Sequence, residues 1–372
     1  MGNPSNRIVG FDIARALAIL GMVMVNYKLA LDAVGNGPNW LVISSDLLEG
    51  RASAIFVILA GIGTALMTKK ARVTKDPSLI METRRIIWKR SLFLLGLGMV
   101  LYFIGWDADI LHYYAFYMLV ASFFIVVTNR SLLFTIIGVL LTSQLFQLIF
   151  DYTQGWDANF QSYESFWSPD GFVRNLFLNG YHPLFPWICF FLFGMWLGRL
   201  NWKDRSLRRK LMGTALVVVL VVEWLSYSLI VFTKPILGTE IARYLFQTKP
   251  MPPTLLYMVS SACTALIVIL LCIRLSEKIR ERWVTKLFEY TGQLALTHYV
   301  GHFFVLLLLF LFGYLNHSFT LSVAMGASFG FFIVAMIGSY AWRSFFSRGP
   351  IEWMMRKVSE NWVGTHQAEQ KL

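Results

Sequence analysis

The chain of 372 residues carries a formal net charge of +12, and 56% of its residues are hydrophobic, 16% aromatic and only 15% charged. Soluble domains average about 25% charged residues, well above the fraction in this chain. The mean hydropathy of the chain is +0.58. The composition excludes an ordinary soluble enzyme, a disordered protein and a nucleic-acid-binding protein, and it predicts a polytopic membrane protein.

Ten apolar runs are long enough to be membrane spans, since a helix needs about 20 mostly apolar residues to cross the hydrocarbon core. They predict a single all-α transmembrane domain over residues 1–372, in which the first helix is retained because no cleavage site follows it. The predicted helices cover 11–30, 52–68, 88–104, 110–128, 131–150, 183–200, 211–232, 254–275, 290–314 and 320–342. The longest connection, 151–181, mixes aromatic and polar residues and predicts a segment at the membrane interface.

Lys and Arg are distributed unevenly between the predicted loops. With the amino terminus inside, 27 of the 33 Lys and Arg residues lie in inner segments and six in outer loops. Cytoplasmic loops carry this excess in membrane proteins, so both termini are predicted to be cytoplasmic. The inner basic charge, concentrated in 84–90 and 199–210, is interpreted mainly as topological charge that contacts anionic lipid.

Polar groups in or beside spans are expensive and are the first places to look for function. On the predicted outer face, Asp109 and His112 are three residues apart, so the carboxylate can orient the imidazole as a general base. For Asp107 and Asp109, a capping role at the start of the next helix is the alternative. The prolines around His182 are expected to place it at the membrane surface. Its imidazole either takes part in catalysis or is simply hydrated.

The predicted inner face and mid-membrane region contain further polar residues. Asp12 and Arg15 are interpreted first as an ion pair and second as ligand contacts. His298 and His302 share a helix face, but no third ligand accompanies them, so helix contacts or a polar cavity are favoured and no metal site is predicted. Glu223 is either a buried structural glutamate or part of a transport path.

Two pairs of glycines in predicted spans are four residues apart. Gly194 and Gly198 form one pair, and Gly326 and Gly330 form the other. This spacing predicts close helix packing at both places.

Several stretches together resemble known families over nearly the whole chain. The segments 11–21, 50–51, 106–111, 295–299 and 348–353, with Asn26, resemble the YeiB-like bacterial inner-membrane family. The segments 180–187 and 193–199 are similar to bacterial relatives of heparan-alpha-glucosaminide N-acetyltransferase, a broader transmembrane acyltransferase group.

This resemblance implies an enzyme of the bacterial inner membrane. It would move an acyl group from cytoplasmic acetyl-CoA, or another acyl-CoA, to a hydroxyl or amine of a carbohydrate acceptor on the far side. Its expected partners are membrane lipids and a second copy in a homodimer, with no metal and no nucleic acid. The implied roles are Asn26 as oxyanion donor; His182 as general base; Asp107 and Asp109 as orienting or acceptor-binding carboxylates; Arg51, His112 and His302 as acceptor contacts; and Asp12, Arg15, Arg90, Arg199 and His298 as CoA contacts.

One departure from the family pattern matters. Members close to the heparan enzyme carry a histidine in the first outer loop, thought to be catalytic, but residues 27–51 contain none. Either His182 or His112 has taken over its role, or the acceptor differs, or this branch does not transfer acyl groups.

The rival interpretation is a small-solute transporter or permease, with the charged and histidine residues of the spans lining a path. Against it, the sequence shows no inverted repeat and no matched pair of broken helices. A non-catalytic membrane scaffold explains the motifs least well.

Overall fold

The computed structural model describes residues 7–158, 160–279, 282–313 and 318–360. These residues form helices and connecting loops, and no β-strand occurs among them. Across the described ranges, seven helices are long and apolar enough to cross a membrane, or up to nine if each of two bent helix pairs is one span. The protein is an all-α polytopic membrane protein, as predicted, while the count of ten and the cytoplasmic termini stay predictions.

The chain divides into two compact units. The first comprises Met1–Phe56, Asp204–Val219 and Ser261–Trp353, and the second comprises Val57–Lys203, Leu220–Ser260 and Met354–Leu372. We describe each unit by itself.

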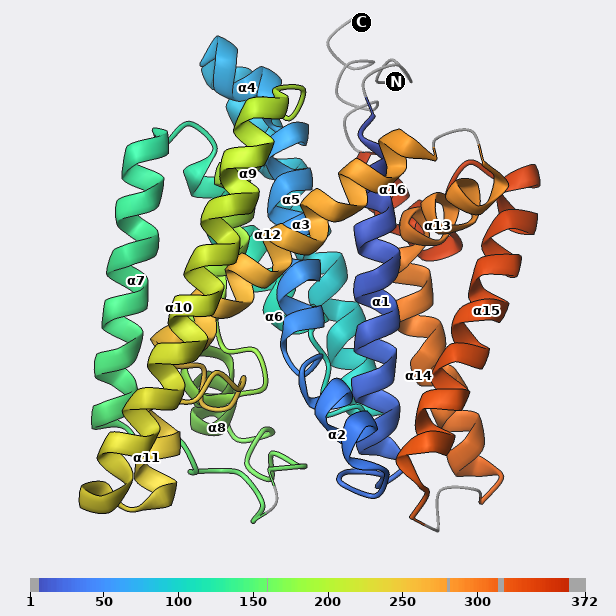
Figure 1. Ribbon diagram of the computed structural model, residues 1–372. Helices are drawn as coiled ribbons and strands as arrows, with labels where there is room; N and C mark the ends of the chain where they lie inside the picture. The colour runs from blue at the N-terminus through green and yellow to red at the C-terminus, as the bar shows by residue number, and fades with distance from the viewer. Residues whose placement is uncertain (1–6, 159, 280–281, 314–317, 361–372) are drawn as a thin grey trace, which may run out of the picture. The chain divides into compact units, whose positions relative to one another are not determined.

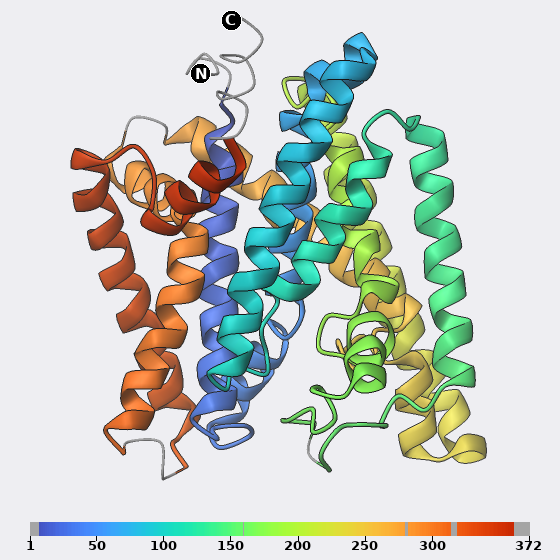
Figure 2. The same cartoon turned by 180° about the vertical axis from the view of Figure 1, so that it is seen from behind.

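The first unit is built around α1. Its other helices are α2 (Asn39–Asp46), α13 (Trp283–Gln293), α14 (Ala295–Leu311) and α15 (Leu321–Phe345), with parts of α3 (Arg51–Met67), α10 (Arg205–Leu237), α12 (Leu255–Lys278) and α16 (Pro350–Glu360). Helix α1 (Val9–Ala30) contacts α13, α14 and α15 (Figures 1 and 2). At the α1–α13 crossing, a Cβ on Gly292 would lie 1.8 Å from the Asp12 carbonyl oxygen, so this approach requires glycine.

The predicted helix 290–314 is divided in the structure. Helices α13 and α14 meet at Leu294 with a bend of 76°. The amino end of α14 is capped from α16, because Glu352 Oε1 accepts hydrogen bonds from the backbone N–H groups of Leu296 (2.8 Å) and Thr297 (3.1 Å). The Thr297 hydroxyl donates to the other carboxylate oxygen, at 2.5 Å. A carboxylate suits this position because the first N–H groups of a helix lack internal partners.

The second unit contains the helices that lead to the predicted outer loops. They are α4 (Lys69–Thr74), α5 (Pro77–Phe103), α6 (Leu111–Ala121), a 3₁₀ turn η2 (Ser122–Phe124), α7 (Asn129–Ile149), α8 (Pro169–Arg174), a π-helical turn η3 (Asn175–Asn179), α9 (Leu184–Leu197) and α11 (Thr239–Phe246), with the remaining parts of α3, α10, α12 and α16. Helix α5 packs along α6, and α7 packs along α9. The bounds of α6 and η2 show that the predicted span 110–128 is a short helix followed by a 3₁₀ turn.

Of the two glycine pairs that predicted close helix packing, the pair in α9 packs against another helix and, within the described residues, the pair in α15 does not. A Cβ on Gly194 would lie 2.1 Å from the Ile58 carbonyl oxygen, and one on Gly198 would lie 2.8 Å from that of Ile62, so α9 and α3 approach through bare backbone. A Cβ on Gly326 or Gly330 would meet nothing within 4 Å. The prediction is confirmed for the pair in α9 and wrong for the pair in α15.

The long connection 151–181 folds onto the end of α5. Trp156, Tyr163 and Phe166 form a buried aromatic cluster with Tyr102, whose ring stacks on Phe166 at 3.6 Å between centroids. Trp167 is 61% exposed. Most of the aromatic side chains of the connection thus fill a small core of their own, and the location of the segment at the membrane interface stays a prediction.

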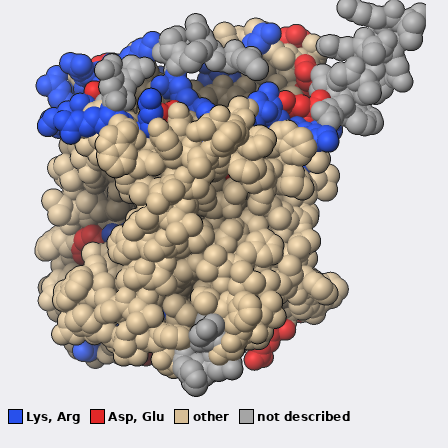
Figure 3. All heavy atoms as spheres, turned by 90° about the vertical axis from the view of Figure 1, so that its right-hand side faces the viewer, with Lys and Arg blue, Asp and Glu red and all other residues tan. Residues whose placement is uncertain are grey.

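The surface has the charge pattern of a membrane protein. On the face shown in Figure 3, Lys and Arg gather at one end, and most of the remaining surface lacks charged side chains. Such an uncharged band is what a hydrocarbon environment requires.

Candidate functional site

A buried carboxylate–imidazole pair lies at the start of α6. Asp109 Oδ2 accepts a hydrogen bond from the backbone N–H of His112 at 3.0 Å and lies 2.9 Å from Nδ1 of the same residue. Both side chains are fully buried. Because the carboxylate accepts from Nδ1–H, the neutral ring carries its lone pair on Nε2. The predicted pair is confirmed, and the carboxylate also performs the capping role that was its alternative.

The imidazole of His112 lies in an aromatic cage. Its centroid is 3.8 Å from that of Tyr113, 5.9 Å from Tyr102 and 5.7 Å from Phe166. Nε2 of His112 and the hydroxyl of Tyr102 are buried without a hydrogen-bond partner among the described residues. A buried polar atom without a partner is costly, so these two atoms are candidates for contact with a polar ligand.

His182 lies beside the same cage. Its backbone carbonyl accepts a hydrogen bond from the Tyr117 hydroxyl, and its ring is 4.5 Å from the Trp187 ring and 5.9 Å from the Tyr113 ring. Nδ1 of His182 is buried and has no partner within the ranges described. Tyr113 thus contacts both imidazoles. We refer to Asp109, His112, His182, Tyr102 and Tyr113 as the histidine cluster.

Tyr113 is held in place by a residue that the sequence did not single out. Its hydroxyl donates a hydrogen bond to Asn175 Oδ1 at 2.5 Å. Asn175 begins the π-helical turn η3 and is buried. No spacing in the sequence links residue 175 with residue 113, so this contact emerges only from the folded connection.

Asp107 is near the cluster in sequence but has a different partner. Its Oδ2 accepts a hydrogen bond from the Ser162 hydroxyl at 2.7 Å. Burial raises the pKa of Asp107 above its ordinary value, while the hydrogen bond from Ser162 opposes that shift. No described contact joins Asp107 to an imidazole, so it fits an acceptor-binding role better than an orienting one.

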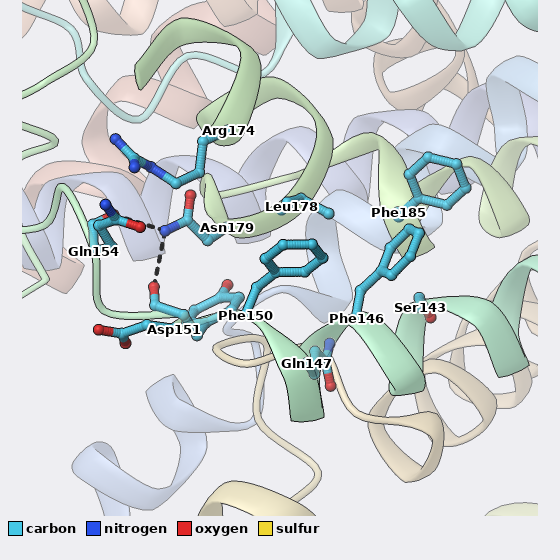
Figure 4. A pocket seen from close by; sticks show the side chains of 11 residues that line it. Ser143, Phe146, Gln147, Phe150, Asp151, Gln154, Arg174, Leu178, Asn179 and Phe185 are labelled. Atoms are coloured by element: carbon cyan, nitrogen blue, oxygen red, sulfur yellow. Dashed lines mark hydrogen bonds between the residues drawn. The ribbon is translucent and has the colours of Figure 1, made fainter. Parts of the chain in front are cut away.

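A small pocket adjoins the segment that carries His182 (Figure 4). Its free volume is about 40 Å³, enough for a water-sized group. It is lined by Ser143, Phe146, Gln147, Phe150, Asp151, Tyr152, Gln154, Arg174, Leu178, Asn179 and Phe185. The Asn179 amide donates to the backbone carbonyls of Tyr152 (2.9 Å) and Gln154 (2.8 Å), as the dashed lines in Figure 4 show. The amide therefore braces the wall of the pocket.

In the first unit, Asn26 and His302 come together. Asn26 Nδ2 lies 2.9 Å from His302 Nε2, and both side chains are buried. His302 Nδ1 contacts the Tyr299 carbonyl oxygen, which makes Nδ1 the protonated nitrogen and Nε2 the acceptor. This pairing was not predicted, since the two residues are 276 positions apart.

The predicted CoA contacts of the first unit are engaged within the protein. Asp12 pairs with Arg15 and with Arg7, each at 2.7 Å, which confirms the predicted ion pair. His298 Nε2 lies 2.6 Å from the Ser339 hydroxyl. Arg51, which was predicted as an acceptor contact, is the first residue of α3 and is half-buried.

The predicted CoA contacts of the second unit are engaged as well. Arg199 donates to the carbonyl oxygens of Val127 (2.6 Å) and Phe124 (2.9 Å), and so holds the end of the segment after α6. Arg90 contacts Met67 Sδ at 3.1 Å and Glu360 at 3.8 Å. These contacts give both arginines a structural role.

Glu223 in α10 fits the structural alternative. It accepts hydrogen bonds from the hydroxyls of Thr248 (2.9 Å) and Ser260 (2.5 Å). The contacts join α10, α12 and the loop between them in the second unit.

The described residues thus define an all-α polytopic membrane protein with a buried carboxylate–imidazole pair. The family profile of the heparan-alpha-glucosaminide N-acetyltransferase catalytic domain matches residues 7–233, and that of a family described as protein of unknown function (DUF418), which is YeiB-like, matches residues 194–361. The first match spans more than half of the chain, and the chain belongs to that transmembrane acetyltransferase-type family. No curated protein matches the chain. The predicted family is therefore confirmed.

Proposed function

We propose that this protein is a membrane-embedded acyltransferase that moves an acetyl or other acyl group from cytoplasmic acyl-CoA to a hydroxyl or amine of a sugar-like acceptor on the extracytoplasmic side. The observation that carries the proposal is Nε2 of His112, which has no hydrogen-bond partner among the described residues, with Asp109 on the opposite ring nitrogen. This arrangement is suited to general-base chemistry. The family supplies the expectation of acyl transfer.

The base is His112 in this proposal, and His182 is its neighbour. His112 has the orienting carboxylate that His182 lacks among its described contacts, so its ring gains a proton at Nε2 with a counter-charge already in place. His182 Nδ1 is then a hydrogen-bond partner for the acceptor. The variants described below test the alternative assignment, in which His182 is the base.

The reaction balances without an external redox partner. Nε2 of His112 takes the proton from the acceptor O–H or N–H, and the freed oxygen or nitrogen attacks the thioester carbonyl. The tetrahedral oxyanion collapses, the C–S bond breaks, and the CoA thiolate takes the proton back from the imidazolium. Asp109 stabilises the imidazolium between these steps.

The remaining roles follow from the resemblance and are part of the proposal. Asn26 keeps one amide hydrogen beyond the one directed at His302, and we propose it as an oxyanion donor. Arg51 and His302 are proposed acceptor contacts. For the donor, we propose Asp12, Arg15, Arg90, Arg199 and His298, with release of some present contacts on binding. A bacterial inner-membrane location, a single transmembrane domain and a homodimer complete the proposal.

Transport is the weaker explanation of the polar residues in spans. Asp12, Arg15, Glu223, His298 and His302 each have a partner within the protein. Donor binding and transport would both require these contacts to open, and the family match favours acyl transfer over transport.

The test begins with acetyl-CoA binding to the detergent-purified protein by calorimetry, with free CoA and ATP as comparators. Saturable binding of acetyl-CoA is expected, followed by acetylation of amino sugars or sugar alcohols in a radiolabel assay. His112→Ala should lower turnover by about 10²–10⁴-fold without loss of acetyl-CoA binding.

His182→Ala separates the two assignments. If His112 is the base, His182→Ala should raise KM for the acceptor more than it lowers kcat. The opposite result, with His112→Ala active and His182→Ala inactive, would move the base to His182. No acyl-CoA binding, together with solute uptake into vesicles without CoA, would overturn the proposed function.

A further inference from the structure

Four arginines surround a cavity in the first unit that the proposed chemistry does not use. The cavity has a volume of about 560 Å³, within the range of about 300–1,000 Å³ typical of ligand pockets. It is lined by Arg205, Arg208, Arg209 and Met212 of α10 and by Leu270, Arg274 and Glu277 of α12. We call it the arginine cavity.

Most of its positive charge is not neutralised. Arg208 pairs with Glu277 at 2.6 Å, which accounts for one arginine and the one carboxylate of the lining. The guanidinium groups of Arg205, Arg209 and Arg274 make no hydrogen bond or ion pair with any residue in the described ranges. Three guanidinium groups therefore remain to bind an anion, and guanidinium is well matched to phosphate oxygens.

The cavity lies at the ends of two candidate spans. Helix α10 has 33 residues and is about 50 Å long, well beyond the hydrocarbon thickness of about 30 Å. Its arginines are in the first two turns, and Arg274 is near the end of α12, with Lys278 the last residue of that helix. The arginines therefore belong at the level of the lipid headgroups.

The lining changes from charged to apolar along both helices. Residues 205, 209, 212 and 216 of α10 follow one another at intervals of three or four and share one face. Met212 and Leu270 line the cavity. Leu216, about one turn beyond Met212 in α10, is 44% exposed, and Leu271, about one turn before Arg274 in α12, is 52% exposed. An anionic head on the arginines would thus continue into apolar chains beside exposed leucines.

We infer that the arginine cavity binds one anionic diacyl phospholipid, with the phosphate between Arg209 and Arg274 and the acyl chains along Met212 and Leu271. The charge gradient within the cavity fits an amphiphile better than a soluble nucleotide. None of the lining residues is aromatic, so the cavity offers no ring on which a base could stack. The predicted cytoplasmic location of these helix ends agrees with the leaflet that carries most anionic lipid.

The test uses the full-length protein in nanodiscs of phosphatidylcholine with or without about 20 mol% phosphatidylglycerol, which supplies anionic headgroups. Arg209→Ala/Arg274→Ala removes two guanidiniums that have no described protein partner, and it leaves the Arg208–Glu277 pair intact. Lys210→Ala/Lys278→Ala is the matched control, because it removes the same charge from neighbouring positions outside the lining. The readouts are co-purified phospholipid per protein by mass spectrometry and the thermal shift caused by phosphatidylglycerol.

The wild type and the lysine control should retain phosphatidylglycerol and be stabilised by it, and the arginine variant should lose at least tenfold in lipid affinity. Arg209→Lys/Arg274→Lys should restore part of it. Equal retention by the arginine variant and the wild type would overturn the inference, as would equal loss in the lysine control, which indicates a general charge effect. Displacement of the lipid by acetyl-CoA, with loss of acetyl-CoA affinity in the arginine variant, would assign the cavity to the donor instead.

Discussion

Asp109 binds a backbone N–H and a ring nitrogen of the same residue, so one carboxylate fixes both the start of α6 and the tautomer of His112. Asp109→Asn keeps the size of the side chain but offers an amide that can present N–H to the ring. The ring would then carry its proton on Nε2, where the lone pair is needed. We expect a loss of about 10²–10⁴-fold in kcat with acetyl-CoA affinity unchanged, measured by steady-state kinetics and calorimetry.

Asp170→Asn is the control for Asp109→Asn, because Asp170 is an exposed carboxylate in α8 with a surface ion pair to Arg174. It should leave kcat within twofold of the wild type, about the effect of a weak surface pair. Equal kcat in the Asp109 variant and the wild type would contradict an orienting role.

Asp107 gives the site a pH dependence of its own. Burial raises the pKa of Asp107, so on acidification this carboxylate takes up its proton at a higher pH than a free aspartate does. If the ionised form binds the acceptor, KM for the acceptor should rise as the pH falls through that pKa. Asp107→Asn should have a high KM that no longer changes over this range. If KM for the acceptor still rises at low pH in Asp107→Asn as it does in the wild type, another group is responsible for the rise.

At the residue scale, the sequence predicted what local spacing can show. Asp109–His112 and Asp12–Arg15 are three apart, so local spacing alone brings each pair together, at the start of α6 in the first case and on one face of α1 in the second. The contacts of Tyr113 with Asn175 and of Asn26 with His302 join distant parts of the chain. Such pairs depend on tertiary packing, which periodicity does not encode.

At the element scale, the two glycine pairs offer a matched comparison. Gly194→Ala places a methyl group against the Ile58 carbonyl of α3 and should destabilise the protein by about 1–3 kcal/mol, since a packed interface must shift. Gly326→Ala enters open space in α15 and should be neutral or slightly stabilising, because alanine favours a helix. Thermal unfolding in one detergent compares them. A larger loss for Gly326→Ala would indicate a packing partner for α15 outside the described contacts.

Helix α14 depends on a cap from a distant segment. Glu352→Gln removes the charge that accepts from Leu296 N–H and Thr297 N–H, so we expect a loss of about 0.5–2 kcal/mol in stability. Glu360→Gln on the same helix α16 is the control, because its contacts with Arg356 and, at 3.8 Å, with Arg90 are made by a carboxylate that is 39% exposed and should contribute little. Similar unfolding temperatures for the two variants would rule out a special role for the cap.

This cap also connects two of the stretches on which the family resemblance was based. Residues 295–299 and 348–353 are far apart in sequence, yet Glu352 and Thr297 join them directly. The sequence alone identified both stretches but gave no reason to connect them. The bend at Leu294 was likewise missed, because the predicted helix began at residue 290 and so joined the last four residues of α13 to α14.

At the scale of the whole molecule, the positive-inside distribution predicts both termini on one side and therefore an even number of spans. The described residues provide at most nine by length and composition, with the shorter apolar helix Leu111–Phe124 left over. At 14 residues it is about 21 Å long, less than the hydrocarbon thickness. Whether α6 and η2 complete a tenth crossing thus decides the topology.

Two exposed positions on either side of α5, α6 and α7 test this crossing. Lys75 follows α4 in a predicted inner segment, and Gln161 lies in the predicted outer connection. Three crossings between them place them on opposite sides, and two place them on the same side. In a background with the cysteines replaced by serine, Gln161→Cys should react with a membrane-impermeant maleimide in right-side-out vesicles, and Lys75→Cys only after permeabilisation. Equal labelling of both before permeabilisation would place both positions on the outer side and contradict an odd number of crossings between them.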